Sequence, residues 1–304
     1  MKIAVLGSGA MGSVFGGLLA EHGQDVVLID TWKEHINAIN KNGLHLEGIG
    51  GDRFINVKGV SSADEIKDHV DLVIVFVKSP FTEPAVMGAS HIIGENTMIM
   101  TLQNGLGNAE KIAEITGSSR IIVGITNNGA TLIEPGHVRH AGSGETVISP
   151  FDGELSHRIN EIAQILTEAG LPTKVSDEVV GLVWDKLMVN VGINALTAIL
   201  KVPNGYLIEH GSSEKLLEYA VREAEKICKA KGIQLKHDPV QHCKDVAKAT
   251  AANYSSMYQD VAKKRITEID YINGAVVNEG RKLGIPTPVN EVFVLLIKAL
   301  EEGY

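Results

Sequence analysis

The first half of the chain alternates short apolar runs with segments in which apolar residues recur at helical spacing. The strand-like runs are KIAVLG (2–7), DVVLID (25–30), DLVIVFVK (71–78) and TMIMTLQNG (97–105). Helical periodicity follows the first two runs, at 10–23 and 32–41. Apolar strands joined through helices predict a parallel sheet with right-handed crossovers.

The pattern changes along the rest of the chain. Residues 43–60 predict a hairpin excursion, and the segment after residue 120 predicts further strands and hairpins at the edge of the sheet. A helix at 155–169 and a strand at 171–176 follow. The remainder is helical, with helices expected at 178–201, 212–232, 267–284 and 290–302 and two shorter ones within 237–264. We therefore expect an α/β Rossmann-type domain (1–177) followed by an all-α domain (178–304).

Composition narrows the class of protein. With a net charge of −9 and mixed signs, the chain is not expected to bind nucleic acid in general. Its longest apolar runs fall short of the roughly 20 residues that a membrane span needs. Cys228 and Cys243 have no CxxC spacing and are expected to be reduced thiols of a cytoplasmic protein. The 11 histidines are scattered without an HExxH or HxH motif, so we expect no metal site.

A glycine motif suggests where a phosphate would bind. GSGAMG (Gly7, Ser8, Gly9, Ala10, Met11, Gly12) fits GxGxxG, directly after a strand and at the start of a helix. In this motif glycines allow a tight turn, close approach of a pyrophosphate and close helix–strand packing, and the helix N-terminus attracts the anion. The motif predicts dinucleotide binding, although glycine loops also serve plain turns.

Three polar residues at the ends of strands extend this prediction. Asp30 ends the second strand, where an acid can accept hydrogen bonds from the ribose hydroxyls of NADH and repel the 2′-phosphate of NADPH. Lys33 could partly offset that repulsion, and Asp30 could instead cap the helix at 32–41. Lys78 and Asn104 follow later strands and are candidates for facing the nicotinamide or a substrate. A solvated strand end and a simple Asn-Gly turn are the alternatives.

The helix WDKLMVNVGIN (184–194) carries an unusual polar stripe. Lys186, Asn190 and Asn194 are spaced by four residues, so they lie along one face of an otherwise apolar helix. The stripe could be an interior polar contact or a site where an amine meets an oxygen. Two later segments, NYSSMYQD (253–260) and TEIDYING (267–274), also carry polar residues at helical spacing.

Taken in order, these motifs resemble the ketopantoate reductase (2-dehydropantoate 2-reductase) family over nearly the whole chain. The resemblance implies a Rossmann domain followed by a helical domain, NADPH or NADH as cofactor and a 2-oxo acid as the small-molecule substrate. The implied reaction, part of pantothenate biosynthesis, reduces 2-dehydropantoate to (R)-pantoate. A homodimer is plausible by the same resemblance.

The resemblance also implies roles for individual residues. Lys186 matches the catalytic general acid, and Glu268 matches a glutamate that contacts the lysine and the substrate. Lys78 matches a lysine beside the cofactor. The residues matching substrate-binding positions are Asn104, Asn190, Asn194, Asn253 and Ser256, with Asn104 also near the nicotinamide. A helix cap is the alternative for Ser256, and a first-turn glutamate favoured by the helix dipole is the alternative for Glu268.

The chain departs from the family at one informative place. Many members have an arginine after the second strand, suited to the 2′-phosphate of NADPH, but this sequence has LIDTWKEH with Asp30 and Thr31. Some relatives are NAD-dependent D-2-hydroxy acid dehydrogenases acting on bulky 2-oxo acids, which is the alternative activity. A 3-hydroxy acid dehydrogenase and a non-catalytic dinucleotide-binding redox sensor are further alternatives. The intact set of polar residues favours an enzyme.

Overall fold

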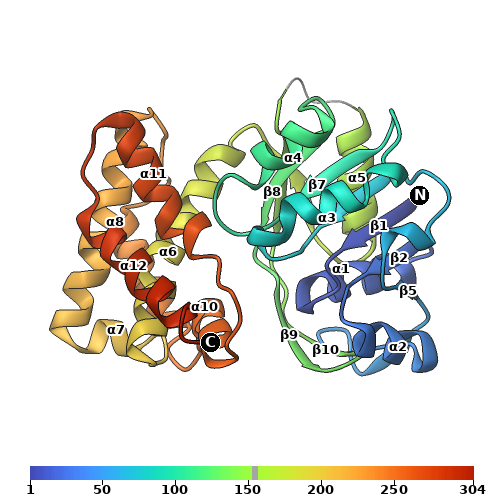
Figure 1. Ribbon diagram of the computed structural model, residues 1–304, viewed down its shortest axis with the longest axis horizontal. Coiled ribbons are helices and arrows are strands. Elements are labelled where there is room, and N and C mark those ends of the chain that lie inside the picture. Colours follow the sequence, from blue (N-terminus) through green and yellow to red (C-terminus); the bar gives the residue numbers. More distant parts are fainter. Residues whose placement is uncertain (153–156) are drawn as a thin grey trace. The chain divides into compact units, whose positions relative to one another are not determined.

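The computed structural model describes residues 1–152 and 157–304, which form two compact units (Figure 1). The first unit comprises residues 1–103 and 108–179, and the second comprises residues 104–107 and 180–304. The sequence predicted a boundary between residues 177 and 178, which would place Asn104 in the first domain. In the structure, residues 104–107 belong to the second unit. The α/β and all-α character expected from the sequence is confirmed.

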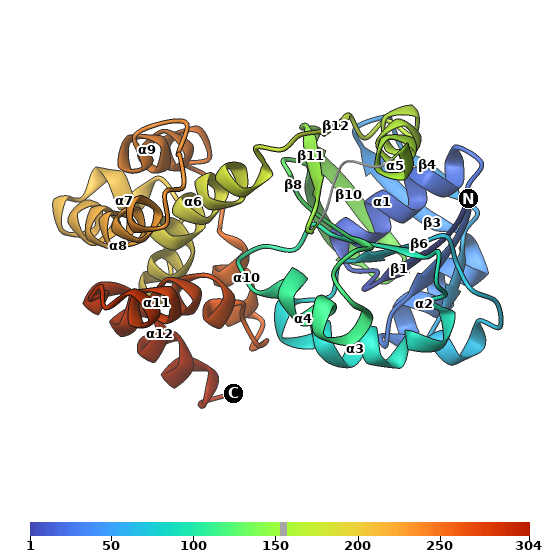
Figure 2. The same ribbon diagram turned by 90° about the horizontal axis from the view of Figure 1, so that it is seen from above.

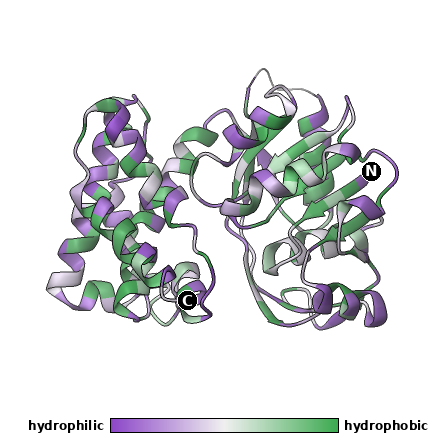
Figure 3. Cartoon of the chain, in the orientation of Figure 1, coloured by the Kyte–Doolittle hydropathy of each residue, from purple (hydrophilic) through white to green (hydrophobic). Residues whose placement is uncertain are grey.

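An eight-stranded sheet forms the centre of the first unit. Its order is β12 (Thr173–Val175), β11 (Thr146–Pro150), β8 (Ile121–Thr126), β7 (Met98–Thr101), β6 (Leu72–Val75), β1 (Lys2–Leu6), β2 (Asp25–Ile29) and β5 (Lys58–Val60). All neighbours are parallel except β8 and β11. The central strands β1 and β6 are mostly apolar (Figure 3), and their successive residues are buried, as expected for a sheet covered by helices on both sides.

Helices cover both faces of this sheet (Figure 2). One face packs against α1 (Ala10–Glu21) and α5 (His157–Glu168), and the other against α3 (Thr82–Gly88) and α4 (Asn108–Thr116). Successive side chains of β1 point to opposite faces of the sheet. Ile3 and Val5 therefore pack in the core beneath α1 and α5, and Ala4 and Leu6 in the core beneath α3 and α4. The helix expected at 155–169 is found, apart from its first two positions, which lie outside the described residues. The other helical segments in the described part of the first unit are α2 (Lys33–Asn42) and the 3₁₀ turns η1 (Ala63–Glu65), η2 (Ser79–Phe81) and η3 (Ser90–Ile92).

A separate four-stranded sheet packs beside α1. Its order is β4 (Arg53–Ile55), β3 (Leu44–Gly48), β10 (His137–Gly142) and β9 (Gly129–Glu134). The expectation that the strands after residue 120 all lie at the edge of the main sheet is therefore wrong for β9 and β10. They pair with the 43–60 excursion instead, through a parallel β3–β10 contact. Local patterning carries no information on such long-range pairing.

Helices make up most of the second unit in the described chain. They are α6 (Val179–Leu200), α7 (Tyr206–Glu209), α8 (Gly211–Ala230), α9 (Pro239–Ala249), α10 (Ser256–Ala262), η4 (Ile269–Tyr271), α11 (Asn273–Leu283) and α12 (Pro288–Glu301). The single helix expected at 267–284 is interrupted at Ile272, whose φ and ψ are −106° and −91°. The short α7 was not anticipated.

The long helix α6 is the core helix of this unit. In the described part of the chain, it is the one helix whose length and apolar composition would allow it to cross a membrane. The sequence contains no uninterrupted apolar run of that length here, so this was not expected. Its residues Leu187, Met188 and Val191 are almost completely buried in the helical core. A Cβ added at Gly192 would lie 2.6 Å from the sulfur of Cys243, so this glycine allows α9 to approach α6 closely.

Buried polar groups fix how the helices meet. The carboxylate of Glu223 on α8 accepts hydrogen bonds from the backbone N–H groups of Val289 and Asn290, both at 3.0 Å, at the start of α12. The side chain of Asn273 donates to the carbonyl of Val191 on α6 and to Asn290. Because buried polar groups are costly without partners, this network favours one arrangement of α6, α8, α11 and α12.

Gly9 and Gly12 give a matched pair of substitutions that tests the packing of the glycine loop. A Cβ added at Gly12 would lie 2.0 Å from the carbonyl oxygen of Gly7, whereas one added at Gly9 would meet no atom within 4 Å. We predict that Gly12→Ala lowers the free energy of unfolding by roughly 1–3 kcal/mol or more, as overpacking does, while Gly9→Ala changes it little. Denaturant unfolding of the two variants measures this, and equal losses of stability would contradict it.

Candidate active site

The glycine loop joins β1 to α1 and is shaped to receive an anion. Gly7 has a φ of +91°, and a Cβ there would lie 2.5 Å from the backbone nitrogen of Val77, so the position requires glycine. Ala10 and Met11 begin α1, whose first turn ends at Gly12. Gly9 is exposed and faces open space. The backbone at the start of α1 is therefore accessible to a phosphate group, as the motif predicts.

Ser8 and Ser13 hold this loop from beneath. The buried hydroxyl of Ser13 donates to the carbonyl of Ser8 over 2.7 Å. The hydroxyl of Ser8 is also buried and has no hydrogen-bond partner among the residues that the structure describes. A buried polar atom beside an exposed glycine is consistent with a loop that completes its hydrogen bonds when a dinucleotide binds.

Asp30 lies at the end of β2, and both of its carboxylate oxygens are fixed. One accepts a hydrogen bond from the backbone N–H of Ser8 at 2.9 Å, and the other from that of Trp32 at 3.0 Å. The helix α2 begins after Trp32 without a side-chain cap, so Asp30 does not serve as the helix cap considered from the sequence. The glycine loop and the acid thus form one hydrogen-bonded structure.

A polar network lies under the carboxyl ends of β6 and β7, next to Lys78. Gln103 donates to the carbonyl of Val77 at 2.6 Å and to the hydroxyl of Thr82 at 2.8 Å. Thr82 in turn donates to Asn108, whose amide donates to Ser79 over 3.1 Å. These bonds fix the backbone on both sides of the half-buried Lys78. Sequence reasoning missed this role of Gln103, although it lies within the LQNG motif.

In the second unit, Lys186, Asn190 and Asn194 lie on the single helix α6, as predicted. Asn194 is buried, whereas Lys186 and Asn190 are partly buried. Glu268 lies just before η4 and is only 5% exposed, so it is not a solvated first-turn glutamate. The structure brings this carboxylate into electrostatic interaction with Lys186.

Lys186 on α6 has a pKa that is strongly lowered from its ordinary value. Burial lowers the pKa from 10.5 to about 8, because desolvation penalises the charged amine, and the negative charge of Glu268 opposes that effect. An amine with a pKa of about 8 can both hold and release a proton near neutral pH. Perturbed lysines of this kind are characteristic of catalytic sites.

The Asn104–Gly107 loop contacts the same segment of the chain as Glu268. The N–H of Leu106 donates to the carbonyl of Tyr271 at 2.9 Å. Gly105 has a φ of +85°, and a Cβ there would lie 2.2 Å from the same oxygen, so only glycine fits. The backbone that follows Asn104 is therefore anchored to the Tyr271 carbonyl, unlike that of a solvent-exposed Asn-Gly turn.

The segment before α10 rules out the helix-cap alternative considered for Ser256. Asn253 and Ser256 are both exposed, and Asn253 engages the rest of the unit through its carbonyl, which accepts a hydrogen bond from the N–H of Asn204 at 2.9 Å. The cap of α10 is the buried Ser255, whose hydroxyl accepts from the N–H of Tyr258, and not Ser256. Thr197 on α6 donates to the Ser255 hydroxyl over 2.7 Å. In a pair of adjacent serines, sequence alone does not identify which one caps the helix.

Comparisons with known proteins identify the family of the chain. The family profile described as "Ketopantoate reductase PanE/ApbA" matches residues 3–153, and its "C terminal" counterpart matches residues 178–301. A 2-dehydropantoate 2-reductase of Pyrococcus horikoshii is 39% identical over 99% of this chain and 98% of its own length. The corresponding protein of Halobacterium salinarum is 37% identical over 98% of each chain.

Solved structures give the same result. D-mandelate dehydrogenase with NADH and anilino(oxo)acetate matches with a TM-score of 0.94 at 33% identity, covering 100% of this chain and 99% of that one. A PanE/ApbA family ketopantoate reductase from Ralstonia eutropha JMP134 matches with a TM-score of 0.93 at 34% identity and the same coverage. The resemblance seen in the sequence motifs is confirmed, and the chain belongs to the ketopantoate reductase family.

Proposed function

We propose that this protein reduces 2-dehydropantoate to (R)-pantoate with a nicotinamide cofactor, using Lys186 as the general acid. The observation that supports the proposal most strongly is the partly buried Lys186, whose amine has a pKa of about 8 and interacts with Glu268 in the helical unit. The full-length relatives named 2-dehydropantoate 2-reductase support the choice of substrate. The glycine loop and Asp30 support binding of the cofactor by the first unit.

The chemistry explains why a lysine is needed. The reduced nicotinamide supplies a hydride to the ketone carbon of the substrate. Negative charge then develops on the ketone oxygen, and the ammonium of Lys186 stabilises that charge and transfers its proton to the oxygen. Glu268 keeps the amine protonated at neutral pH by opposing the effect of burial. No metal ion is required for these steps.

The other polar residues are assigned to binding. Asn190 and Asn194 lie along the same helix face as Lys186 and can orient the substrate without adding charge. Asn253 and Ser256 are exposed at the start of α10, where an amide and a hydroxyl can bind the carboxylate. In addition, Asn104 is assigned to the substrate and nicotinamide, and Lys78 to the cofactor.

A D-2-hydroxy acid dehydrogenase acting on other bulky 2-oxo acids is the second candidate. The structural match to D-mandelate dehydrogenase favours it, because that protein aligns over the whole chain. Both activities use the same chemistry and differ in the group attached to the ketone. A redox sensor without turnover is disfavoured by the presence of both Lys186 and Glu268, since a sensor has no need for a perturbed acid.

Asp30 favours NADH over NADPH. Its carboxylate is fixed by two backbone N–H groups, so the negative charge cannot move away from a 2′-phosphate. The D-mandelate dehydrogenase structures contain NADH, which supports the same choice. Lys33 directly follows Trp32 and offsets part of the repulsion.

A substrate panel tests the proposed function. Loss of the reduced-nicotinamide absorbance is measured with ketopantoate, 2-oxoisovalerate and phenylglyoxylate, each with NADH and NADPH. We predict the highest kcat/KM with ketopantoate. A higher value with phenylglyoxylate would instead assign the chain to the second candidate, and cofactor binding without turnover of any 2-oxo acid would make it a sensor.

The variant Lys186→Ala tests whether Lys186 is the general acid, and Lys248→Ala is its matched control. Lys186→Ala should lose about 10²–10⁴-fold in kcat, the usual contribution of a positioned acid, while still binding the cofactor. Lys248 is exposed near the end of α9, so its loss should leave kcat unchanged. Near-normal turnover by Lys186→Ala would exclude it as the acid.

The pH dependence tests the pairing of Lys186 with Glu268. Because reduction requires the protonated amine, kcat/KM should fall above about pH 8. Glu268 raises the pKa of Lys186, so Glu268→Gln should lower that pKa and move the falling limb to lower pH. Asp270→Asn is the control, because the exposed Asp270 pairs with Lys298 instead. A limb that stays in place in Glu268→Gln would refute the pairing.

Cofactor choice has its own test. Asp30→Asn removes the charge at nearly constant shape, so the NADH/NADPH ratio of kcat/KM should fall by about fivefold, as expected for the loss of a repulsion of roughly 1 kcal/mol. Asp30→Asn also weakens a hydrogen bond to the glycine loop, which should raise KM for NADH and NADPH equally. The NADH/NADPH ratio of kcat/KM therefore reports only the effect of removing the negative charge. An unchanged ratio would mean that Asp30 does not contact the ribose.

A further inference from the structure

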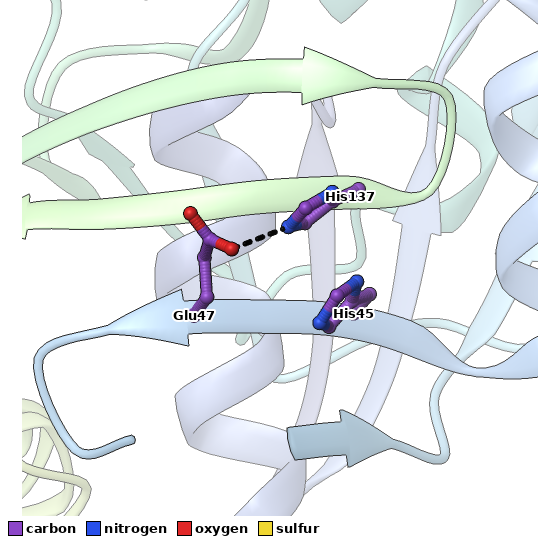
Figure 4. Close-up of side chains that lie close together, drawn as sticks. All are labelled: His45, Glu47 and His137. Atoms are coloured by element: carbon purple, nitrogen blue, oxygen red, sulfur yellow. Dashed lines mark hydrogen bonds and ion pairs between the residues drawn. The ribbon is translucent and has the colours of Figure 1, made fainter. Parts of the chain in front are cut away.

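His45, Glu47 and His137 form a cluster on the four-stranded sheet, apart from every residue assigned above. His45 and Glu47 lie two residues apart on β3 and point to the same face, and His137 lies opposite His45 on the parallel neighbour β10 (Figure 4). All three are partly buried. Each offers one nitrogen or oxygen atom, and these atoms lie within 4.8 Å of one another. The cluster could not be recognised in the sequence, because His137 lies 90 residues after Glu47.

The groups around the cluster hold its side chains in place. Nε2 of His137 is 3.0 Å from one carboxylate oxygen of Glu47, and the other oxygen is bound by Arg139. Nε2 of His45 lies 2.5 Å from a carboxylate oxygen of Asp52. The two imidazole rings stack with their centres 3.8 Å apart. Two imidazoles and the carboxylate of Glu47 therefore already lie close to one another, and the carboxylate of Asp52 contacts His45.

Charge around the cluster matches a divalent cation. Three carboxylates, from Glu47, Asp52 and Glu134, contact the two histidines, while Arg139 is the cation bonded to this group. With both imidazoles neutral, this leaves an excess of two negative charges.

We propose that this cluster binds one Zn²⁺ ion, with His45, His137 and Glu47 as ligands and Asp52 as the fourth. Zinc prefers imidazole and carboxylate ligands at about 2.0–2.2 Å in tetrahedral geometry, which places ligand atoms about 3.3 Å apart. Ligand atoms of His45, Glu47 and His137 that lie up to 4.8 Å apart therefore have to approach one another by up to about 1.5 Å to reach that geometry. The metal replaces the hydrogen bond between His137 and Glu47.

Glu134 completes the arrangement around His137. Nδ1 of His137 lies 3.8 Å from a carboxylate oxygen of Glu134. Metal-bound histidines almost always donate their second N–H to a carboxylate or a carbonyl, which fixes the tautomer and the ring. When Nε2 of His137 binds the metal, its Nδ1 carries the proton and points to Glu134.

The ion would join β3 to β10 and so stabilise the sheet that packs on α1. The side chain of Leu44, at the start of β3, contacts α1 at Gly17, where an added Cβ would lie 2.7 Å away. The strands β3 and β10 share only four register pairs in the described structure. A metal bridge between strands so distant in sequence stabilises the folded chain by mass action, because the unfolded chain lacks the site.

Calorimetric titration with Zn²⁺ alone, on protein without a histidine tag, tests the proposal. The wild type should bind one equivalent, and the double variant His45→Gln/His137→Gln should bind at least about 10–100-fold more weakly. His69→Gln is the control, since this histidine is exposed in the same unit. Circular dichroism and 2-oxo acid reduction show whether each variant is folded.

A second measurement separates this site from binding elsewhere. Zn²⁺ should raise the thermal unfolding midpoint of the wild type and of His69→Gln, but not that of the double variant. Equal binding by the wild type and the double variant would place the metal elsewhere, for example on His237 and His242, whose rings are 5.4 Å apart, and would overturn the proposal. Absence of binding by the wild type at millimolar Zn²⁺ would also overturn it.

Discussion

The opposition between burial and the charge of Glu268 sets the protonation state of Lys186, and the proposed chemistry depends on it. Burial on α6 lowers the pKa of the amine to about 8, a displacement worth about 3 kcal/mol against the charged form. Without the carboxylate the amine would lose its proton at a still lower pH. The partial burial of Lys186 is therefore as necessary as Glu268, since full exposure to water would return the pKa to its ordinary value.

One short segment positions several of these groups. Residues 267–272 provide the carboxylate of Glu268 and, three residues later, the carbonyl of Tyr271 that holds the Asn104 loop. Ser255 is linked to α6 through Thr197, so α10 is positioned by the same helix that carries Lys186. The polar network of Glu223, Asn273 and Asn290 then fixes α8, α11 and α12 around α6.

The sequence predicted most elements of the fold, because hydrophobic periodicity is a local property. The apolar strand at residues 2–7 and the position of α6 could both be predicted in this way. The pairing of β10 with β3 could not, because the partners are far apart in the chain and both strands are short. The break at Ile272 was also missed, since the apolar spacing continues through it.

The candidate site was predictable where residue type and spacing carry the chemistry. The stripe from Lys186 to Asn194 and the glycine loop are of this kind. Residues that act by holding others are harder to recognise, and Gln103 and Ser255 show why. Their importance comes from partners such as Val77 and Thr197, which only the folded chain brings within hydrogen-bond distance.

The assignment of residues 104–107 to the helical unit has a consequence for how this architecture can evolve. The polypeptide changes unit three times, after residues 103, 107 and 179, rather than once. Exchanging C-terminal halves between relatives at residue 177 would replace Tyr271 but leave behind Gly105, which packs against its carbonyl oxygen. Because this contact is made to a main-chain carbonyl, the incoming half would have to keep the same local backbone at that position, and the residue type there matters less.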